Sequence, residues 1–384
     1  MSKNNNNNTP HLRFPGFTGE WVEKKLGEVA SSFSGGTPKS SESKYYGGDI
    51  PFIRSGEIHG CKTELYITEE GLNKSSAKLV SKGDLLIALY GATSGEVAIS
   101  KIDGAINQAI LCVRSQSINS NYLCNYLEYK KDTITSKFLQ GGQGNLSSDI
   151  IMSLNIPSPT PAEQRKIASC LSAMDNLISA QSQKVEALKD QKKGMMQQLF
   201  PQKGETTPRL RFPEFSGEWK EYEFGDCFEI GSGRDYKHLD EGHIPVYGSG
   251  GYMCSVNDYL YDGESACIGR KGTINNPILL SGKFWTVDTL FYTYNYVNTT
   301  AYFIYLLFQN IDWMKHNEAG GVPSLSKNII KKIKVFIPSL TEQQKISDCL
   351  SALDAQIAAE TEKLTALKDH KKGLMQQLFP QPAK

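Results

Sequence analysis

The chain has 384 residues, of which 39% are hydrophobic and 22% are charged. This length suits two or three domains, and this composition excludes an intrinsically disordered chain. Lysine and arginine number 42 against 41 aspartates and glutamates, and the net charge of +1 excludes a uniformly basic nucleic-acid binder. Any polyanionic partner must therefore bind a local patch.

Residues 1–10 are polar and rich in asparagine, with no apolar signal region, and we expect them to be disordered. No segment approaches the ~18 apolar residues of a membrane helix, and the nearest, residues 84–92, is far too short. The eight cysteines are scattered with no CxxC pair, which is evidence against a zinc site or a disulfide scaffold. These features favour a cytoplasmic protein that does not contact membranes.

Residues 11–156 are expected to form a first, strand-rich domain that opens with an edge motif from Arg13 to Trp21. A helix is expected over residues 121–129, ahead of a glycine-rich loop at residues 141–146. Short β-rich runs bounded by glycine and serine turns predict strands at residues 50–53, 84–90, 96–99, 109–113 and 154–156.

Residues 157–201 are expected to form a long helix. Thr160 and Glu163 make a capping box around Pro161, and Pro201 ends the helix. About 40 residues give a length of roughly 60 Å. Residues in a sustained 4-3 spacing predict a coiled-coil seam. They are Ile167, Leu171, Met174, Ile178, Gln181, Val185, Leu188, Lys192, Met195 and Leu199.

Residues 202–336 are expected to form a second strand-rich domain, and residues 337–384 a second long helix. Strands are predicted at residues 244–247, 265–268, 284–287 and 290–294, and a helix at 301–313 ahead of the loop 320–325. Ser339 and Glu342 cap the long helix, and Pro380 ends it. Its predicted seam contains Ile346, Leu350, Leu353, Ile357, Glu360, Leu364, Leu367, Lys371, Leu374 and Leu378.

The two halves of the sequence share their first and last segments, called the edge motifs, and differ in the residues between them, called the centres. Residues 13–21 recur as 211–219, and residues 171–201 recur as 350–380 with 20 of 31 positions identical. The centres share only short matching segments, which suggests that one scaffold serves two distinct recognition tasks. The predicted fold is mixed α/β: two strand-rich α+β domains joined by two long helices in an antiparallel coiled coil, with an internal pseudo-twofold repeat.

No sequence motif supports catalysis by this chain. It contains no GxxxxGK[ST] phosphate loop, no GxGxxG at a strand–helix junction, no HExxH and no [ND]PP[YF] tetrapeptide. The six histidines have no spacing that makes a metal-ligand set. We therefore expect no catalytic residue, no metal and no cofactor in this chain.

The centres do contain turns that place polar and basic side chains beside glycines. Amides and arginine can bond bases bidentately, and loop hydroxyls can bond phosphates. Each such motif alone is more often structural than functional, but their recurrence at parallel places in both centres makes their residues candidates for contacts with bases and phosphates. In the first centre the candidates are Arg54, Ser55, Glu57, Tyr90, Thr93, Ser94, Asn107, Gln108, Gln143 and Asn145. In the second they are Tyr247, Ser249, Arg270, Lys271, Thr273, Trp285, Asp288 and Ser324.

The edge motifs resemble those of the specificity subunit of type I restriction–modification systems. The resemblance rests on the duplicated LRFPxFxGEW phrase, on NLSxxxIxxLxIP at residues 145–157 running into Glu163-Gln164, and on Ile337-Pro338 running into Glu342-Gln343. It spans residues 11–380. The second copy departs from it in the glycine-rich loop, where Val322, Pro323 and Ser324 replace Gln143, Gly144 and Asn145.

The resemblance implies that each centre is a target recognition domain for one half of a bipartite site in double-stranded DNA. It implies that the helices set the spacing of the half-sites and dock two methyltransferase subunits, which restriction and translocase subunits then join. S-adenosylmethionine, ATP and Mg²⁺ would belong to those partners. We also predict that a change of helix length between Glu163 and Leu199 alters the spacer without altering either half-site.

Three alternatives stay open from the residues. The chain could be a coiled-coil adaptor with two ligand-binding heads and no DNA. It could be the recognition part of a restriction–modification enzyme of another type, which neighbouring genes would reveal. It could also be an enzyme in its own right, which would require cofactor binding by the isolated chain.

Overall fold

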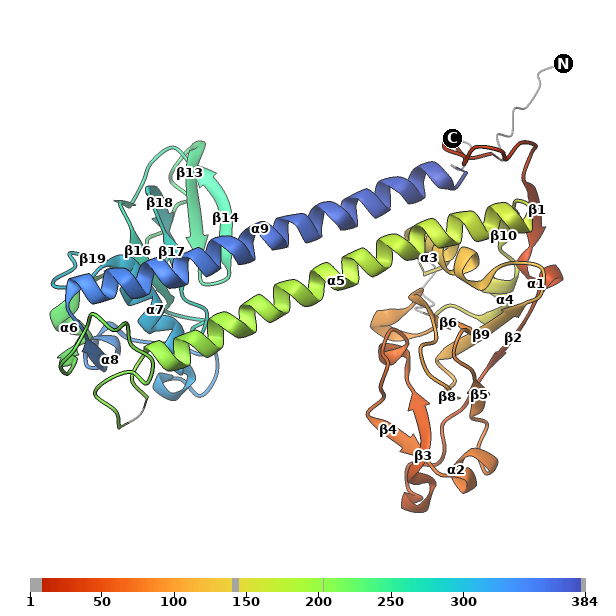
Figure 1. Cartoon of the computed structure of the whole chain (residues 1–384), viewed down its shortest axis with the longest axis horizontal. Helices are drawn as coiled ribbons and strands as arrows, with labels where there is room; N and C mark the ends of the chain where they lie inside the picture. Colours follow the sequence, from red (N-terminus) through yellow and green to blue (C-terminus); the bar gives the residue numbers. More distant parts are fainter. Residues whose placement is uncertain (1–8, 140–144, 203, 381–384) are drawn as a thin grey trace. The chain divides into compact units, whose positions relative to one another are not determined.

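The computed structural model describes residues 9–139, 145–202 and 204–380, which form two compact units. Unit 1 comprises residues 1–182 and 362–384, and unit 2 comprises residues 183–361. The helices α5 (Pro161–Leu199) and α9 (Leu340–Leu378) each contribute a segment to both units (Figure 1). The boundaries of the compact units therefore fall inside the long helices, whereas the predicted domain limits lie at the helix ends.

Unit 1 combines three small sheets with the helix α3 (Ser120–Leu139). The first sheet pairs β1 (Val22–Lys25) with β10 (Asn155–Ser158). The second has the order β2 (Ala30–Ser34), β9 (Ile110–Ser115), β6 (Leu85–Ala88), β7 (Val97–Ile99). The third has the order β4 (Leu65–Ile67), β3 (Tyr46–Ile53), β8 (Gly104–Ile106), β5 (Lys78–Val80). The short helical segments are α1 (Leu26–Val29), η1 (Ser43–Tyr45), η2 (Ser55–Glu57), α2 (Glu69–Asn73), η3 (Gly91–Thr93) and α4 (Ser148–Met152).

Unit 2 has the same three sheets, with equivalent strand orders, together with the helix α7 (Ala301–Asn310). β11 (Lys220–Glu223) pairs with β20 (Lys334–Ile337). The second sheet has the order β12 (Glu229–Ser232), β19 (Leu290–Tyr294), β16 (Ser265–Gly269), β17 (Ile278–Leu280). The third has the order β14 (Gly251–Val256), β13 (Glu241–Gly248), β18 (Lys283–Thr286), β15 (Tyr261–Asp262). The short segments are α6 (Phe224–Cys227), η4 (Trp313–His316) and α8 (Lys327–Lys331).

The two centres thus share one strand order although their sequences diverge. In each unit the third sheet contains one parallel pair, β3 with β8 and β13 with β18, at matching registers. The central strands β6 and β16 are buried along their whole length, LLIA in one and SACIG in the other. Strand register depends on which positions of a strand face the core and not on which apolar residue occupies them. The two centres can therefore keep one fold while their loop sequences differ.

A single large core in each unit joins the second sheet to the domain helix and to both long helices. In unit 1, Phe379 after the end of α9 packs edge-on against Tyr122 and Tyr126 of α3. In unit 2, Phe200 after the end of α5 packs against Trp219 and Phe303. The repeated QQLFP phrase therefore anchors the C-terminal end of each long helix in the unit where that helix ends.

The duplicated edge motifs also have a structural role inside each unit. Arg13 donates two hydrogen bonds, of 2.9 and 2.8 Å, to the buried Glu163 carboxylate in the first turn of α5. Arg211 donates two bonds of 2.8 Å to Glu342 in the first turn of α9. Charge-assisted pairs with two parallel bonds are among the stronger polar contacts, and these two tie the chain entering each unit to the start of a long helix.

Within each unit the segments of α5 and α9 lie side by side and antiparallel (Figure 1). In unit 2, Lys184 contacts Glu360 and Lys192 contacts Asp354, so residue numbers rise along one helix as they fall along the other. Every residue of both predicted seams is buried or half buried. Met196 and Met375 are also buried, next to the seam residues Met195 and Leu374.

Several elements differ from those expected. α3 extends to Leu139, ten residues beyond the predicted end, because its second half still buries Ile134 against the core. α7 ends at Asn310, three residues early, and Trp313 lies in the separate turn η4. There the Trp313 indole N–H bonds the Phe308 carbonyl at 2.8 Å. Eleven strands were not predicted: β1, β2, β4, β5, β8, β11, β12, β14, β15, β17 and β20.

Within residues 9–139, 145–202 and 204–380, no helix is long and apolar enough to cross a membrane.

Candidate DNA interface

Four loops that carry most of the predicted contact residues meet at one edge of unit 2. They follow β13, β16, β18 and α7. The Ser249 hydroxyl donates to the Lys271 carbonyl at 2.9 Å, and Lys271 forms a β-bridge with Ser324. The Arg270 guanidinium donates to the Asp288 carbonyl at 3.3 Å. The structure therefore brings together residues that lie up to 75 positions apart.

Unit 1 has the same edge, built from the loops after β3, β6, β8 and α3. The Leu89 N–H bonds the Ala109 carbonyl at 2.8 Å, and the Leu89 carbonyl accepts from the Leu146 N–H at 2.9 Å. Arg270 makes the same two bonds in unit 2, with Thr289 and Leu325, at 2.8 and 2.9 Å. Leu89 and Arg270 therefore occupy equivalent positions, and so do their successors Tyr90 and Lys271.

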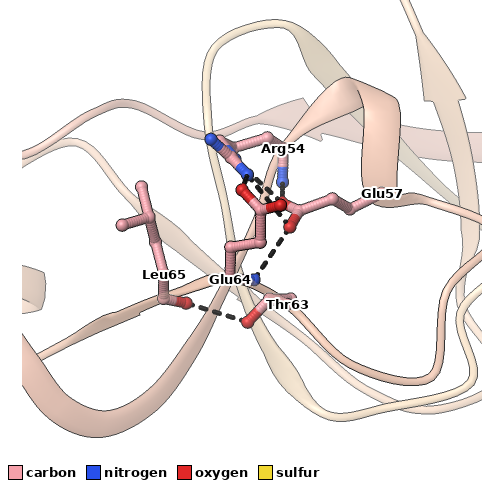
Figure 2. Close-up of polar contacts among 5 residues, drawn as sticks. All are labelled: Arg54, Glu57, Thr63, Glu64 and Leu65. Carbon is pink, nitrogen blue, oxygen red and sulfur yellow. Dashed lines mark hydrogen bonds and ion pairs between the residues drawn. The ribbon is translucent and has the colours of Figure 1, made fainter. Parts of the chain in front are cut away.

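Arg54 lies at this edge of unit 1 with its guanidinium engaged by two carboxylates (Figure 2). Its Nε and Nη2 donate to Glu57 at 3.0 and 3.1 Å, and Nη2 also donates to Glu64 at 2.5 Å. The hydrogen bonds that Arg54 donates to Glu57 and Glu64 raise its pKa. Burial alone would raise the pKa of Glu57, but hydrogen bonds from Arg54 and from two backbone N–H groups lower it overall. A bidentate contact with guanine needs two neighbouring guanidinium nitrogens, and in Arg54 both Nε and Nη2 already donate to carboxylates.

The other candidates in unit 1 divide by exposure. Tyr90, Gln108 and Asn145 are exposed, and the Gln108 side-chain carbonyl accepts a hydrogen bond from the Thr37 hydroxyl at 2.7 Å. Ser55, Thr93 and Asn107 are half buried. Gln143 lies outside the described residues. Ser94 is buried, and its hydroxyl bonds the Leu89 carbonyl at 3.0 Å, which holds the turn after β6.

In unit 2, Arg270, Lys271, Thr273 and Asp288 are exposed, whereas Tyr247, Ser249 and Ser324 are half buried. Trp285 is 5% exposed in the core of the third sheet, and its indole N–H donates to the Arg234 carbonyl at 2.9 Å. The structure gives Ser94 and Trp285 packing and turn contacts, so neither side chain faces the exposed edge.

The motifs in the sequence did not single out a run of lysines that begins at this edge with Lys327. α8 and the residues after it carry Lys327, Lys331, Lys332 and Lys334, whereas the equivalent residues 148–155 of unit 1 contain no lysine and one aspartate, Asp149. Alignment of Leu146 with Leu325 would have shown this difference. Turn motifs do not reveal these lysines, because the lysines follow the turn and are not part of it.

The duplicated segments were compared with known protein families. Residues 18–190 and 216–369 each match the family model of the type I restriction modification DNA specificity domain. The chain belongs to this family. Each matched segment of this specificity-family chain contains the edge loops of one unit.

Relatives and solved structures agree with the family assignment. The MjaIX specificity subunit of Methanocaldococcus jannaschii is 25% identical, over 94% of this chain and 92% of the relative. The EcoprrI specificity subunit of Escherichia coli is 23% identical, over 89% of each chain. The type I S subunit from M. genitalium superimposes with a TM-score of 0.66 at 18% identity, covering 98% of this chain and all of the other. A chain from a structure concerned with assembly of a type I restriction–modification system gives a TM-score of 0.55 at 14% identity. The structural likenesses show that the specificity-family fold is shared.

Proposed function

We propose that this chain is the subunit of a type I restriction–modification complex that selects the DNA sequence, with unit 1 and unit 2 each reading one half of a two-part site. The observation that carries the proposal is the repeated edge: four loops meet at the same place in each unit, on the same strand order, with different side chains. A retained scaffold with changed loops is what two different half-sites require.

The exposed side chains at each edge suit contacts in the DNA grooves. Gln108 and Asn145 in unit 1 carry amides that can bond adenine bidentately. Arg270 and Lys271 in unit 2 can bond guanine or phosphate, and Asp288 can accept a bond from cytosine. The two units therefore offer different hydrogen-bonding groups at equivalent places, which supports recognition of two unlike half-sites.

The long helices suit a role in spacing and assembly. Because α5 and α9 are antiparallel equivalents, the internal repeat matches half-sites of opposite orientation, and helix length would set their separation. We propose that the exposed faces of these helices dock two methyltransferase subunits, which restriction and translocase subunits then join. Catalysis, together with S-adenosylmethionine, ATP and Mg²⁺, would then lie in those partners, in the cytoplasm.

The experiment that tests the function is long-read modified-base sequencing of DNA from cells with and without the gene. A gapped two-part methylated motif should disappear on deletion and return with a plasmid copy of the gene. As a control, the same plasmid carrying an early stop codon should not restore methylation. If no motif changes, and tagged chain isolated from the cells retains no methyltransferase subunit, the adaptor function is favoured instead.

A further inference from the structure

An open groove of about 510 Å³ lies at the edge of unit 2, between the loop after β16 and the start of α8. Three cationic residues line it: Arg270, Lys271 and Lys327. Three hydroxyl side chains also line it, those of Ser232, Ser324 and Ser326. A groove lined by cations and hydroxyls has the donors that phosphate oxygens accept from, and it offers no carboxylate among its lining residues.

The three cations of this groove are not neutralised. Among the described residues, none of Arg270, Lys271 and Lys327 forms a salt bridge with a carboxylate. In unit 1, two cations near the matching edge do form such pairs: Arg54 with Glu57 and Glu64, and Lys131 with Glu96. The excess positive charge is therefore a property of unit 2 and not of the shared fold.

The difference lies at equivalent positions. Unit 1 has Leu89 and Tyr90 where unit 2 has Arg270 and Lys271, as their common backbone bonds show. It has Ser148 where unit 2 has Lys327, because both residues follow the serine that caps α4 or α8. A duplicated loop system thus carries three cations in one copy and none at the same positions in the other.

Packing keeps the charges close together. Lys327 lies over the Phe291 ring, with its Nζ 5.8 Å from the ring centroid. Burial, and then the positive charges of Lys331 and Arg270, lower the pKa of Lys327. Lys331 also faces Glu229, which offsets part of its charge. A bound anion would relieve the repulsion between Lys327 and Arg270.

We propose that this groove, lined by Arg270, Lys271 and Lys327, binds backbone phosphates of DNA, and that unit 1 has no equivalent site. Unit 2 then supplies much of the salt-dependent, sequence-independent affinity, whereas unit 1 contributes mainly contacts without net charge. This inference rests on the proposed function, since it names the ligand of one edge of the DNA interface.

The test measures DNA binding by the full chain as a function of salt. A fluorescein-labelled 30-base-pair duplex of arbitrary sequence serves as the probe, and anisotropy gives the affinity between 50 and 200 mM KCl. R270Q, K271Q and K327Q should each reduce the slope of log K against log[KCl] by about 0.9, the value for one lost phosphate contact. For each variant this corresponds to about 3.5-fold less loss of affinity across that salt range.

K283Q is the matched control, because it removes one positive charge from unit 2 at a residue that does not line the groove. Lys283 is the first residue of β18, and the loop near the groove follows the other end of that strand. Its slope should equal that of the unaltered chain. Slopes unchanged in all three groove variants would overturn the inference, as would undetectable binding of the unaltered chain at 50 mM KCl. K271Q changes an exposed side chain, so it tests the groove even if a variant at Lys327 unfolds. If the inference fails while a methylated motif still depends on the gene, the phosphate site is wrong and the proposed function stands.

Discussion

Lys192 of α5 lies with its Nζ 2.7 Å from Oδ1 of Asp354 in α9, within unit 2. The equivalent residues in unit 1 make the same pair with the helices exchanged: Lys371 of α9 lies 2.7 Å from Asp175 of α5. Each lysine also donates a hydrogen bond to a third helix of its unit. Lys192 donates to Gln309 of α7, and Lys371 donates to Glu128 of α3. Each seam lysine therefore joins both long helices to a recognition unit.

Loss of one partner should destabilise the fold. Lys192 is 11% exposed, and Asp354 also accepts a bond of 2.8 Å from the Tyr302 hydroxyl. Lys192→Ala removes the cation and leaves these acceptors without it, and we expect a loss of about 1–3 kcal/mol in the free energy of unfolding. Urea denaturation followed by circular dichroism measures it. Lys189→Ala is the control, because within the described residues Lys189 forms a salt bridge only with the exposed Glu186, and it should cost less than ~0.5 kcal/mol. Equal effects of the two variants would contradict a structural role for the seam lysine.

Stability should fall as the pH rises above about 10. Burial raises the pKa of Tyr296 to about 12, and burial also raises the pKa of Tyr122 well above its usual value. Between the unfolded and folded values the unfolded chain binds fewer protons, so the free energy of unfolding decreases with pH through this range. Absorbance at 295 nm and urea denaturation at pH 9 to 12 measure both effects. Tyr296→Phe should make the free energy of unfolding fall less steeply with pH, by a slope that corresponds to at most one proton. An unchanged slope would show that the pKa of Tyr296 is not raised in the folded chain.

Removal of the Glu57 carboxylate distinguishes two roles for that residue. Glu57→Gln removes one of the two carboxylates that engage the Arg54 guanidinium and takes a negative charge from the edge of unit 1, so binding to an arbitrary duplex should strengthen about two- to fivefold at 50 mM KCl. Anisotropy measures it, with Glu70→Gln as the control because Glu70 pairs with Lys44 away from Arg54. Weaker binding would instead indicate that Glu57 itself contacts a base.

Helix length should determine the spacer between half-sites. One heptad added to α5 between Asp175 and Lys192, with one added to α9 between Asp354 and Lys371, keeps the seam in phase and keeps both lysine pairs. Seven residues add about 10.5 Å, which is close to three base pairs at ~3.4 Å each. Modified-base sequencing should then show unchanged half-sites with a spacer about three base pairs longer.

A four-residue insertion in α5 alone is the comparison for this experiment. It turns the following seam residues about 40° away from α9, because each residue advances roughly 100° around the helix. We expect destabilisation rather than a new spacer. If the double-heptad chain methylated the original motif, helix length would not set the spacing.

The long helices could be predicted almost to the residue because their signal is local. The heptad period, the capping residues and the prolines all act within one element, and the predicted helix after Thr160 matches α5. Strands with a buried run were also found, and residues 290–294 match β19. The strands β1 and β11 were missed because VEKK and KEYE have no buried alternation, and they are strands only because a distant partner supplies their hydrogen bonds.

The sequence by itself determined that the chain contains two copies of one unit with long seam helices, because repeats and periodicity can be recognised without knowing any distant contact. Only the tertiary structure decided which candidate side chains are free to contact DNA. It buried Trp285, engaged Arg54 with two glutamates, and brought Lys327 beside Arg270, which lies 57 residues earlier. The burial of Trp285 and the approach of Lys327 to Arg270 depend on pairings between distant segments, which no local pattern of residues encodes, whereas Arg54 and Glu57 lie only three residues apart.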